Sequence, residues 1–380
     1  MQHNRIAHRS ARLSRRGFLK QAFLAGSAAL LPGITPIDRR AQPGVLPLIV
    51  DGHIDLGWNI VNFGRDYTRS AYDIRADTAG TPAQQVQGQA MVGLPQLLGG
   101  QVALLIGNIF VIPAHLTSSE SYVTRYTTPS EANYWGWTML DTIEALAARS
   151  ENMVIVQSGV DLDAVLASWA PDQPIERRQV GIILGMEGAD PITTPGELQT
   201  WYARGLRSIG LSWGRTQYAG SSSEDGELTL PGVQLLNEMK RLGVLLDVAH
   251  LSEAAFWQAN NLWVGPLVYS HGNSRHYLAT ERGVSDDQIR VIAERDGLIG
   301  IGVYNGFYTQ NVITPGQVTV EDVANAIDYV CQLTGDSLHA AIGSDVDGSF
   351  GAESAPLGID TVADLQKIPP ALSQRGYQPV

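Results

Sequence analysis

Histidine and carboxylate side chains of the type that binds metal ions close several apolar runs of the sequence. His53 and Asp55 end the run Ile49–Asp55, and residues two apart on an extended strand point to the same face. Glu187, His250 and His271 each close a later apolar run. Imidazole and carboxylate donors without cysteine suit zinc or a similar divalent ion. The pattern therefore predicts one binuclear metal site built from these five residues.

Such a site needs a carboxylate that bridges the two ions. Related barrels often use a carbamylated lysine, but past the N-terminal segment only Lys240 and Lys367 are present, and neither ends a predicted strand. Glu187 is the available bridge, because a glutamate that closes an apolar run must be paired or bound to metal. Asp345 follows the last predicted strand and is predicted to orient a metal-bound water. Asp347, two residues later, is interpreted as an Asx-turn residue at a strand exit.

The histidines also allow plainer interpretations. Taken singly, His250 or His271 is more often a satisfied polar residue than a ligand, and the case for both rests on their joint placement with His53 at strand ends. His115 and His339 have no supporting pattern and are interpreted as loop or surface residues. His276 stays ambiguous.

Two other classes of function compete with the metal-dependent hydrolase. Gly210–Gly214 fits G-x-S-x-G, the nucleophile elbow of serine hydrolases, with Ser212 as nucleophile. That elbow needs a helix directly after the serine, whereas a polar loop rich in Gly and Ser follows here. The third class is a non-catalytic exported barrel that binds metal and peptide. Sensitivity to chelators or to phosphonofluoridates separates the two enzyme classes.

The ligands need a scaffold that gathers strand ends. Eight segments read as strands and alternate with helix-like segments, which predicts an α/β fold with a parallel sheet. Eight such strands suggest a closed (β/α)8 barrel of the TIM type, as in metal-dependent hydrolases, where successive strand ends build the active site. The predicted strands are Leu48–Asp55, Val102–Ile109, Val180–Glu187, Leu206–Leu211, Val244–Ala249, Leu267–Ser270, Leu298–Gly302 and Ala340–Ser344. The predicted helices are Glu131–Ser150, Asp161–Trp169, Pro195–Ala203, Gly232–Leu242, Ser252–Asn260, Ser285–Asp296 and Val320–Leu333. Two long loops, Phe110–Ser130 and Arg215–Pro231, are expected over the catalytic face.

Residues 1–41 are predicted to be an export signal and 45–380 a single catalytic domain. Ser14–Lys20 matches the twin-arginine signal, and the apolar stretch after it is too short for a normal membrane span. We therefore expect a periplasmic protein without stable membrane insertion. Of 26 basic and 38 acidic residues, eight and one lie in residues 1–41, which leaves 18 and 37 and a net charge of −19. Such a charge disfavours nucleic acid as a partner. The single cysteine, Cys331, excludes an internal disulfide.

Five motifs in order resemble the membrane (renal) dipeptidases, which are zinc-dependent amidohydrolase-like barrels. They are Asp51–Leu56, Met186–Gly188, Leu246–His250, Ser270–His271 and Gly343–Gly348. The resemblance implies two Zn²⁺ ions per chain, one held by His53 and Asp55 and the other by His250 and His271, with Glu187 as the bridge. It implies that Arg282 binds the terminal carboxylate of the substrate. It also implies that a metal-bridged hydroxide attacks the carbonyl and that Asp345 carries the proton.

The sequence departs from the family pattern in two places. Where the family commonly has a substrate-contacting histidine in L-T-H, this chain has Leu211-Ser212-Trp213, and indole cannot relay a proton as imidazole does. Trp213 is therefore expected to shape the substrate site instead. The family usually continues into a final helix beyond the point where this sequence ends. The expected partner is a small peptide or amide substrate, and a homodimer is left open.

Overall fold

Eight parallel strands close into a barrel in the computed structural model, which describes residues 46–117, 123–308 and 317–378. Seven neighbour pairs follow the sheet order, and β2 pairs with β6 from Leu104 opposite Gly181 to Phe110 opposite Glu187, which closes the ring. The (β/α)8 prediction and all eight predicted strand positions are confirmed. The barrel strands are β1 (Ile49–Ile54), β2 (Val102–Phe110), β6 (Val180–Glu187), β7 (Leu206–Gly210), β8 (Leu245–Asp247), β9 (Leu267–Tyr269), β10 (Leu298–Ile301) and β11 (Ala340–Ile342).

A further strand, β5 (Met153–Ile155), lies beside the barrel and was not predicted. It pairs with Val180–Ile182 in the first half of β6, and β7 pairs with Leu184–Glu187 in the second half. Three residues are too few to give a recognisable alternation in sequence. The strand that carries Glu187 is thus bonded along its whole length on both sides.

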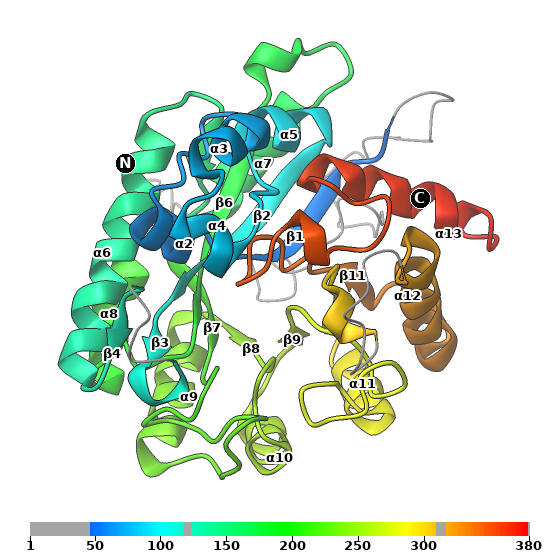
Figure 1. Cartoon of the computed structure of the whole chain (residues 1–380). Helices are drawn as coiled ribbons and strands as arrows, with labels where there is room; N and C mark the ends of the chain where they lie inside the picture. The colour runs from blue at the N-terminus through cyan, green and yellow to red at the C-terminus, as the bar shows by residue number, and fades with distance from the viewer. Residues whose placement is uncertain (1–45, 118–122, 309–316, 379–380) are drawn as a thin grey trace, which may run out of the picture.

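The predicted helices surround the strands (Figure 1). Their ends follow from ordinary capping: Thr128 and Glu131 form a capping box at the start of α6, and Gly243 ends α9 in the left-handed conformation. The apolar side of each helix faces the barrel, as the buried Leu140 and Ile143 of α6 do. These helices are α6 (Pro129–Ala148), α7 (Gly159–Ser168), α8 (Leu198–Ala203), α9 (Leu230–Leu242), α10 (Glu253–Leu262), α11 (Asp286–Glu294) and α12 (Val320–Thr334).

Four short helices between β1 and β2 were not predicted. They are α2 (Leu56–Phe63), α3 (Ala71–Thr78), α4 (Pro82–Gln87) and α5 (Leu94–Gly99). Gly64 ends α2 with φ of 63° and the Ser70 side chain caps α3, so the stop and start signals were present in sequence. We call residues 56–99 the β1–β2 insertion. It packs on the side of the barrel formed by β2, and its α5 contacts the 3-10 helix η6 (Val362–Lys367), which leads into the C-terminal α13 (Ile368–Ser373) (Figure 1).

The two long loops are joined by a side-chain contact between their described parts. Within 110–130, β3 (Ile112–Pro113) pairs with β4 (Arg125–Tyr126), and residues 118–122 lie outside the described part. Ala219 and Leu228 form a bridge within 215–231. His115 Nε2 lies 2.8 Å from Glu224 Oε1, so a hydrogen bond links one loop to the other.

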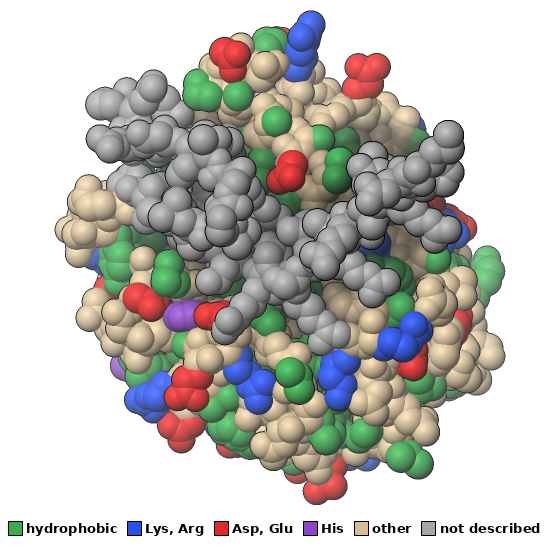
Figure 2. Space-filling model, turned by 180° about the vertical axis from the view of Figure 1, so that it is seen from behind, with side chains coloured by type: hydrophobic (Ala, Val, Ile, Leu, Met, Phe, Trp, Pro, Cys, Tyr) green, Lys and Arg blue, Asp and Glu red, His purple; other side chains and the backbone are tan. Residues whose placement is uncertain are grey.

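The N-terminal segment, the helices and the surface complete the description of the fold. The predicted signal, residues 1–41, lies outside the described residues. In the described ranges, no helix has the length and apolar character needed to cross a membrane. On the described part of the rear face, basic side chains are interspersed with acidic and apolar ones (Figure 2).

Candidate metal centre

The five predicted ligands come together at the carboxyl ends of the barrel strands. His53 lies on β1 with Asp55 directly after it, and Glu187 is the last residue of β6. His250 and His271 follow β8 and β9 within a few residues, and His250 adopts a left-handed backbone with φ of 64°. Because parallel strands all end at one rim of a barrel, residues far apart in sequence meet there.

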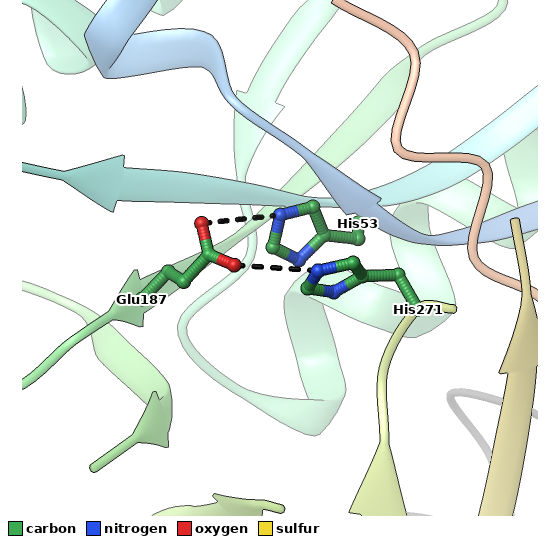
Figure 3. Close-up of side chains that lie close together, drawn as sticks. All are labelled: His53, Glu187 and His271. Atoms are coloured by element: carbon green, nitrogen blue, oxygen red, sulfur yellow. Dashed lines mark ion pairs between the residues drawn. The ribbon is translucent and has the colours of Figure 1, made fainter. Parts of the chain in front are cut away.

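The carboxylate of Glu187 lies between His53, which we call the first group, and the pair His250 and His271, which we call the second group. Its Oε1 lies 3.0 Å from His250 Nε2 and 3.3 Å from His271 Nε2. Its Oε2 faces His53 Nε2 at 3.6 Å (Figure 3). Each oxygen thus serves a different group, which is the arrangement that a bridging carboxylate requires.

Other possible ligand atoms lie close to these histidine nitrogens on both sides of Glu187. On one side, Asp55 Oδ1 lies 3.4 Å and Asp345 Oδ1 3.8 Å from His53 Nε2. On the other side, His250 Nε2 and His271 Nε2 lie 3.0 Å apart. Ligand atoms of His53, Glu187 and His271, and again of His53, Asp55 and Asp345, converge within 4.8 Å. The two sets share His53, and His250 lies against the first of them, so the rim provides one contiguous cluster of donors.

The donors fit divalent cations on physical grounds. His53 Nε2 and Asp55 Oδ1 are buried, and neither has a hydrogen-bond partner among the described residues. A buried polar atom without a partner is costly. Two imidazole nitrogens at 3.0 Å cannot both present lone pairs to each other without a proton or a cation between them. Divalent ions held here would give each of these atoms a partner.

A relay behind His271 selects the correct tautomer. Its Nδ1 lies 2.9 Å from Ser270 Oγ, and the Ser270 hydroxyl donates to Asp247. The hydroxyl oxygen therefore accepts the Nδ1 proton, and Nε2 keeps its lone pair for a metal. The Asn108 amide nitrogen lies 2.9 Å from His53 Nδ1 and, in this orientation, donates to it; only the opposite amide orientation, with the oxygen toward the ring, would leave Nε2 of His53 free for a metal. The sequence pattern gives no role to Ser270, Asp247 or Asn108; the only signal is a polar residue within or just after an otherwise apolar strand.

The electrostatics of the centre favour a positive charge between the carboxylates. Burial lowers the pKa of His53, but the carboxylates of Glu187 and Asp55 outweigh it and raise that pKa well above its usual value. Burial raises the pKa of Glu187, but His53, His250 and His271 outweigh it and lower that pKa well below normal. Burial and the charge of Arg282 lower the pKa of His250 to about 4, which keeps it neutral and able to bind metal.

Asp345 and Asp347 have different roles from each other. Asp345 faces the centre, and its backbone N–H donates to the carbonyl of His53 at 3.2 Å. Burial raises the pKa of Asp345 well above its usual value, and the nearby Asp55 and Glu187 add to this. The interpretation of Asp347 as a simple turn residue is wrong. Its carboxylate is fully buried in an ion pair with Arg65, 2.9 Å from Nη1.

Arg282 is held at the edge of the centre. Its Nη1 donates to the Tyr269 hydroxyl at 2.9 Å and to the carbonyl of His271 at 3.2 Å. The guanidinium carbon lies 5.1 Å from the centre of the Phe307 ring. Nη2 is buried and has no hydrogen-bond partner within the described part of the chain. One end of the guanidinium is therefore fixed by protein, and the other remains for a ligand.

Trp213 lies beside the second histidine group. Its ring centre is 6.0 Å from that of His250 and 5.0 Å from that of Phe110. The preceding Ser212 is fully buried, and its hydroxyl donates to the backbone carbonyl of His250 at 3.3 Å. No helix begins after it until Leu230, so the serine hydrolase alternative is wrong.

The remaining histidines lie outside the centre. His115 pairs with Glu224 on the surface, and His339 Nδ1 bonds the carbonyl of Gly297 at 2.9 Å. His276 stacks on Tyr329, with ring centres 4.6 Å apart. The ambiguity over His276 is thereby resolved in favour of a packing role.

The geometry agrees with what sequence and structure comparisons find. The family model described as membrane dipeptidase (peptidase family M19) matches residues 46–380. An uncharacterized dipeptidase of Schizosaccharomyces pombe is 24% identical over 337 residues, which cover 86% of this chain and 75% of that protein. An uncharacterized protein from the pqqA 5′ region of Klebsiella pneumoniae is 29% identical over 212 residues, which cover 53% of this chain and 76% of that protein. A metallo peptidase from Rhodobacter sphaeroides, solved with a phosphinate mimic of the dipeptide L-Ala-D-Ala, shares the fold with a TM-score of 0.69 at 22% identity. That likeness covers 88% of this chain and 94% of that one.

Proposed function

The chain belongs to the membrane dipeptidase family, peptidase family M19, and is a metal-dependent dipeptidase; we propose that two zinc ions serve it. His53 and Asp55 would hold one ion, His250 and His271 the other, and Glu187 would bridge them. The observation that carries the proposal is the Glu187 carboxylate, whose two oxygens face separate histidine groups. A donor set of imidazoles and carboxylates without thiolate suits zinc.

The bound ions would polarise the scissile carbonyl and lower the pKa of a water molecule, which is the usual chemistry of two-metal hydrolases. The protein would supply the rest. Asp345, buried beside His53, would accept a proton from the attacking water and return it to the leaving amine. Burial raises the pKa of Asp345 above its usual range, which is the direction that favours a group that accepts a proton. The fixed tautomer of His271 would keep this rim ready for metal without reorganisation.

The substrate class follows from the two residues at the edge of the centre. Arg282 would bind the terminal carboxylate through the unpartnered Nη2, because a guanidinium makes strong charge-assisted hydrogen bonds to carboxylates. Trp213 would form an apolar wall beside the scissile bond, where relatives commonly carry histidine. The R. sphaeroides metallo peptidase was solved with a mimic of L-Ala-D-Ala, which makes small dipeptides with L,D stereochemistry the first candidates.

Metal analysis and a substrate panel together test this function. Purified protein should contain about two divalent ions per chain, in keeping with a two-metal site. It should hydrolyse some members of a panel of L,L-, L,D- and N-acylated dipeptides, lose activity on chelation and regain it with Zn²⁺. Full activity after exhaustive chelation would refute metal dependence. Hydrolysis of acylated substrates alone would move the assignment from dipeptides to another small amide.

We also propose that the twin-arginine route exports the protein to the periplasm. Support comes from the sequence Ser14–Lys20, which has the paired Arg15 and Arg16 followed by Gly-Phe-Leu-Lys. The stretch that follows, Gln21–Ile34, is only mildly apolar and shorter than an ordinary membrane span.

A further inference from the structure

The segment that carries Asp345 has an unusual backbone. Asp345, Asp347 and Ser349 adopt left-handed φ angles of 61°, 62° and 63°. Each such residue other than glycine costs free energy, and a run of them persists only where the surroundings hold it. The contacts that hold residues 345–349 in this conformation therefore also fix the position of Asp345.

The Asp347 carboxylate provides much of that support. Arg65 Nη1 lies 2.9 Å from Oδ1, the Tyr67 hydroxyl donates to Oδ2 at 2.9 Å, and the Met91 N–H donates to Oδ1 at 2.8 Å. Arg65, Tyr67 and Asp347 are almost wholly buried. Buried, satisfied hydrogen bonds of this kind are strong and directional.

The backbone carbonyl of Asp347 is held as well. The side-chain amides of Asn59 and Gln87 both donate to it, Asn59 at 2.8 Å. The same Asn59 amide nitrogen donates to the carbonyl of Asp55 at 2.8 Å. One buried amide thus joins a predicted metal ligand at the end of β1 to the loop that follows β11. We call this network the Asp347 hub; its members are Asn59, Arg65, Tyr67, Gln87, Met91 and Asp347.

Every partner of Asp347 in the hub comes from the β1–β2 insertion, and none of them touches the metal ligand atoms. We propose that Asp347 is a positioning residue, and that the insertion acts through it to hold Asp345 in reach of the reacting water. This proposal rests on the proton-carrying role assigned to Asp345 above. It gives the insertion a task in catalysis rather than in packing alone.

Tyr67→Phe is the sharpest test, because it removes one hydrogen bond to Asp347 and keeps the ring. We expect kcat to fall about tenfold while KM and metal content stay unchanged, since a displaced catalytic group lowers turnover steeply. Asp347→Asn, which also breaks the pair with Arg65, should lower kcat by about a hundredfold if it folds. Tyr329→Phe is the matched control, because its hydroxyl bonds Asp286 at 2.8 Å on the outer helices. An unchanged kcat in Tyr67→Phe, or metal loss in parallel with kcat, would overturn the proposal.

Hydrogen exchange provides a readout that does not depend on substrate. The amides of Ser344, Asp345 and Gly348 are all hydrogen-bonded in the segment. Tyr67→Phe should speed exchange of a peptide covering residues 343–349, whereas Tyr329→Phe should leave it unchanged. Equal exchange in Tyr67→Phe and wild type would overturn the positioning role. A wild type that hydrolyses no dipeptide would instead count against the proposed function. The exchange result would still test whether Asp347 holds the segment that carries Asp345.

Discussion

Replacing Arg282 tests the substrate class most directly. In the structure one guanidinium nitrogen, Nη1, is already engaged by Tyr269 and the carbonyl of His271, which leaves Nη2 as a buried donor. A hydrogen bond between charged groups contributes about 1.5–3 kcal/mol, and each 1.36 kcal/mol is a factor of ten. Arg282→Ala should therefore lower kcat/KM for a dipeptide with a free carboxylate by roughly 10- to 150-fold.

The comparison with the C-terminal amide of the same dipeptide isolates this contact. Arg282 also lowers the pKa of His250 through its charge, so its loss will disturb the centre itself. That disturbance affects acid and amide alike and cancels in their ratio. Arg275→Ala is the control, because Arg275 belongs to the same loop but pairs with Glu253 at 2.8 Å. Equal losses on acid and amide in Arg282→Ala would refute the carboxylate contact and favour another small amide as substrate.

Three further predictions concern the bridge, the apolar wall and the signal. Glu187→Gln should lower bound metal below two ions per chain, measured by mass spectrometry, and should lower activity by more than about a hundredfold, because even the loss of a residue that only supports a metal ligand costs about 10- to 100-fold. Full metal occupancy would contradict the bridging role. Trp213→His should raise kcat on L,L-dipeptides by about tenfold if the imidazole assists proton transfer, whereas Trp213→Ala should broaden the substrate panel with metal content unchanged. Changing Arg15 and Arg16 both to Lys should keep the precursor in the cytoplasm on fractionation, and normal periplasmic delivery would disprove the twin-arginine route.

Much of the barrel could be predicted because its strands lie within apolar runs that alternate with helical segments. The run Val180–Glu187 is buried throughout and ends in a carboxylate, so both the strand and the ligand were visible in sequence. The five ligands could be grouped because strand ends of a parallel barrel share one rim. Periodicity could not reveal β5 or the helices α3 to α5, which have three to eight residues each.

The contacts that surround the metal ligands could not be predicted from the sequence, for a different reason. Asp347 reads as a turn residue because its partners lie about 250 to 290 residues away in sequence, in the β1–β2 insertion. The role of Ser270 depends on which nitrogen of His271 it faces, and side-chain direction is not encoded in spacing. These contacts form only when the barrel closes and brings the distant segments together, so sequence spacing does not predict them.

The unequal lengths of the barrel strands bear on how metal is acquired. Glu187 and His53 stand on β6 and β1, with eight and six residues, and β6 is paired along its length on both sides. His250 and His271 follow β8 and β9, with three residues each. More strand hydrogen bonds therefore anchor the first group before any ion arrives, and we expect binding there to have less ordering entropy to overcome. Loading is expected to be stepwise, with the first ion entering beside His53 and the second beside His250 and His271.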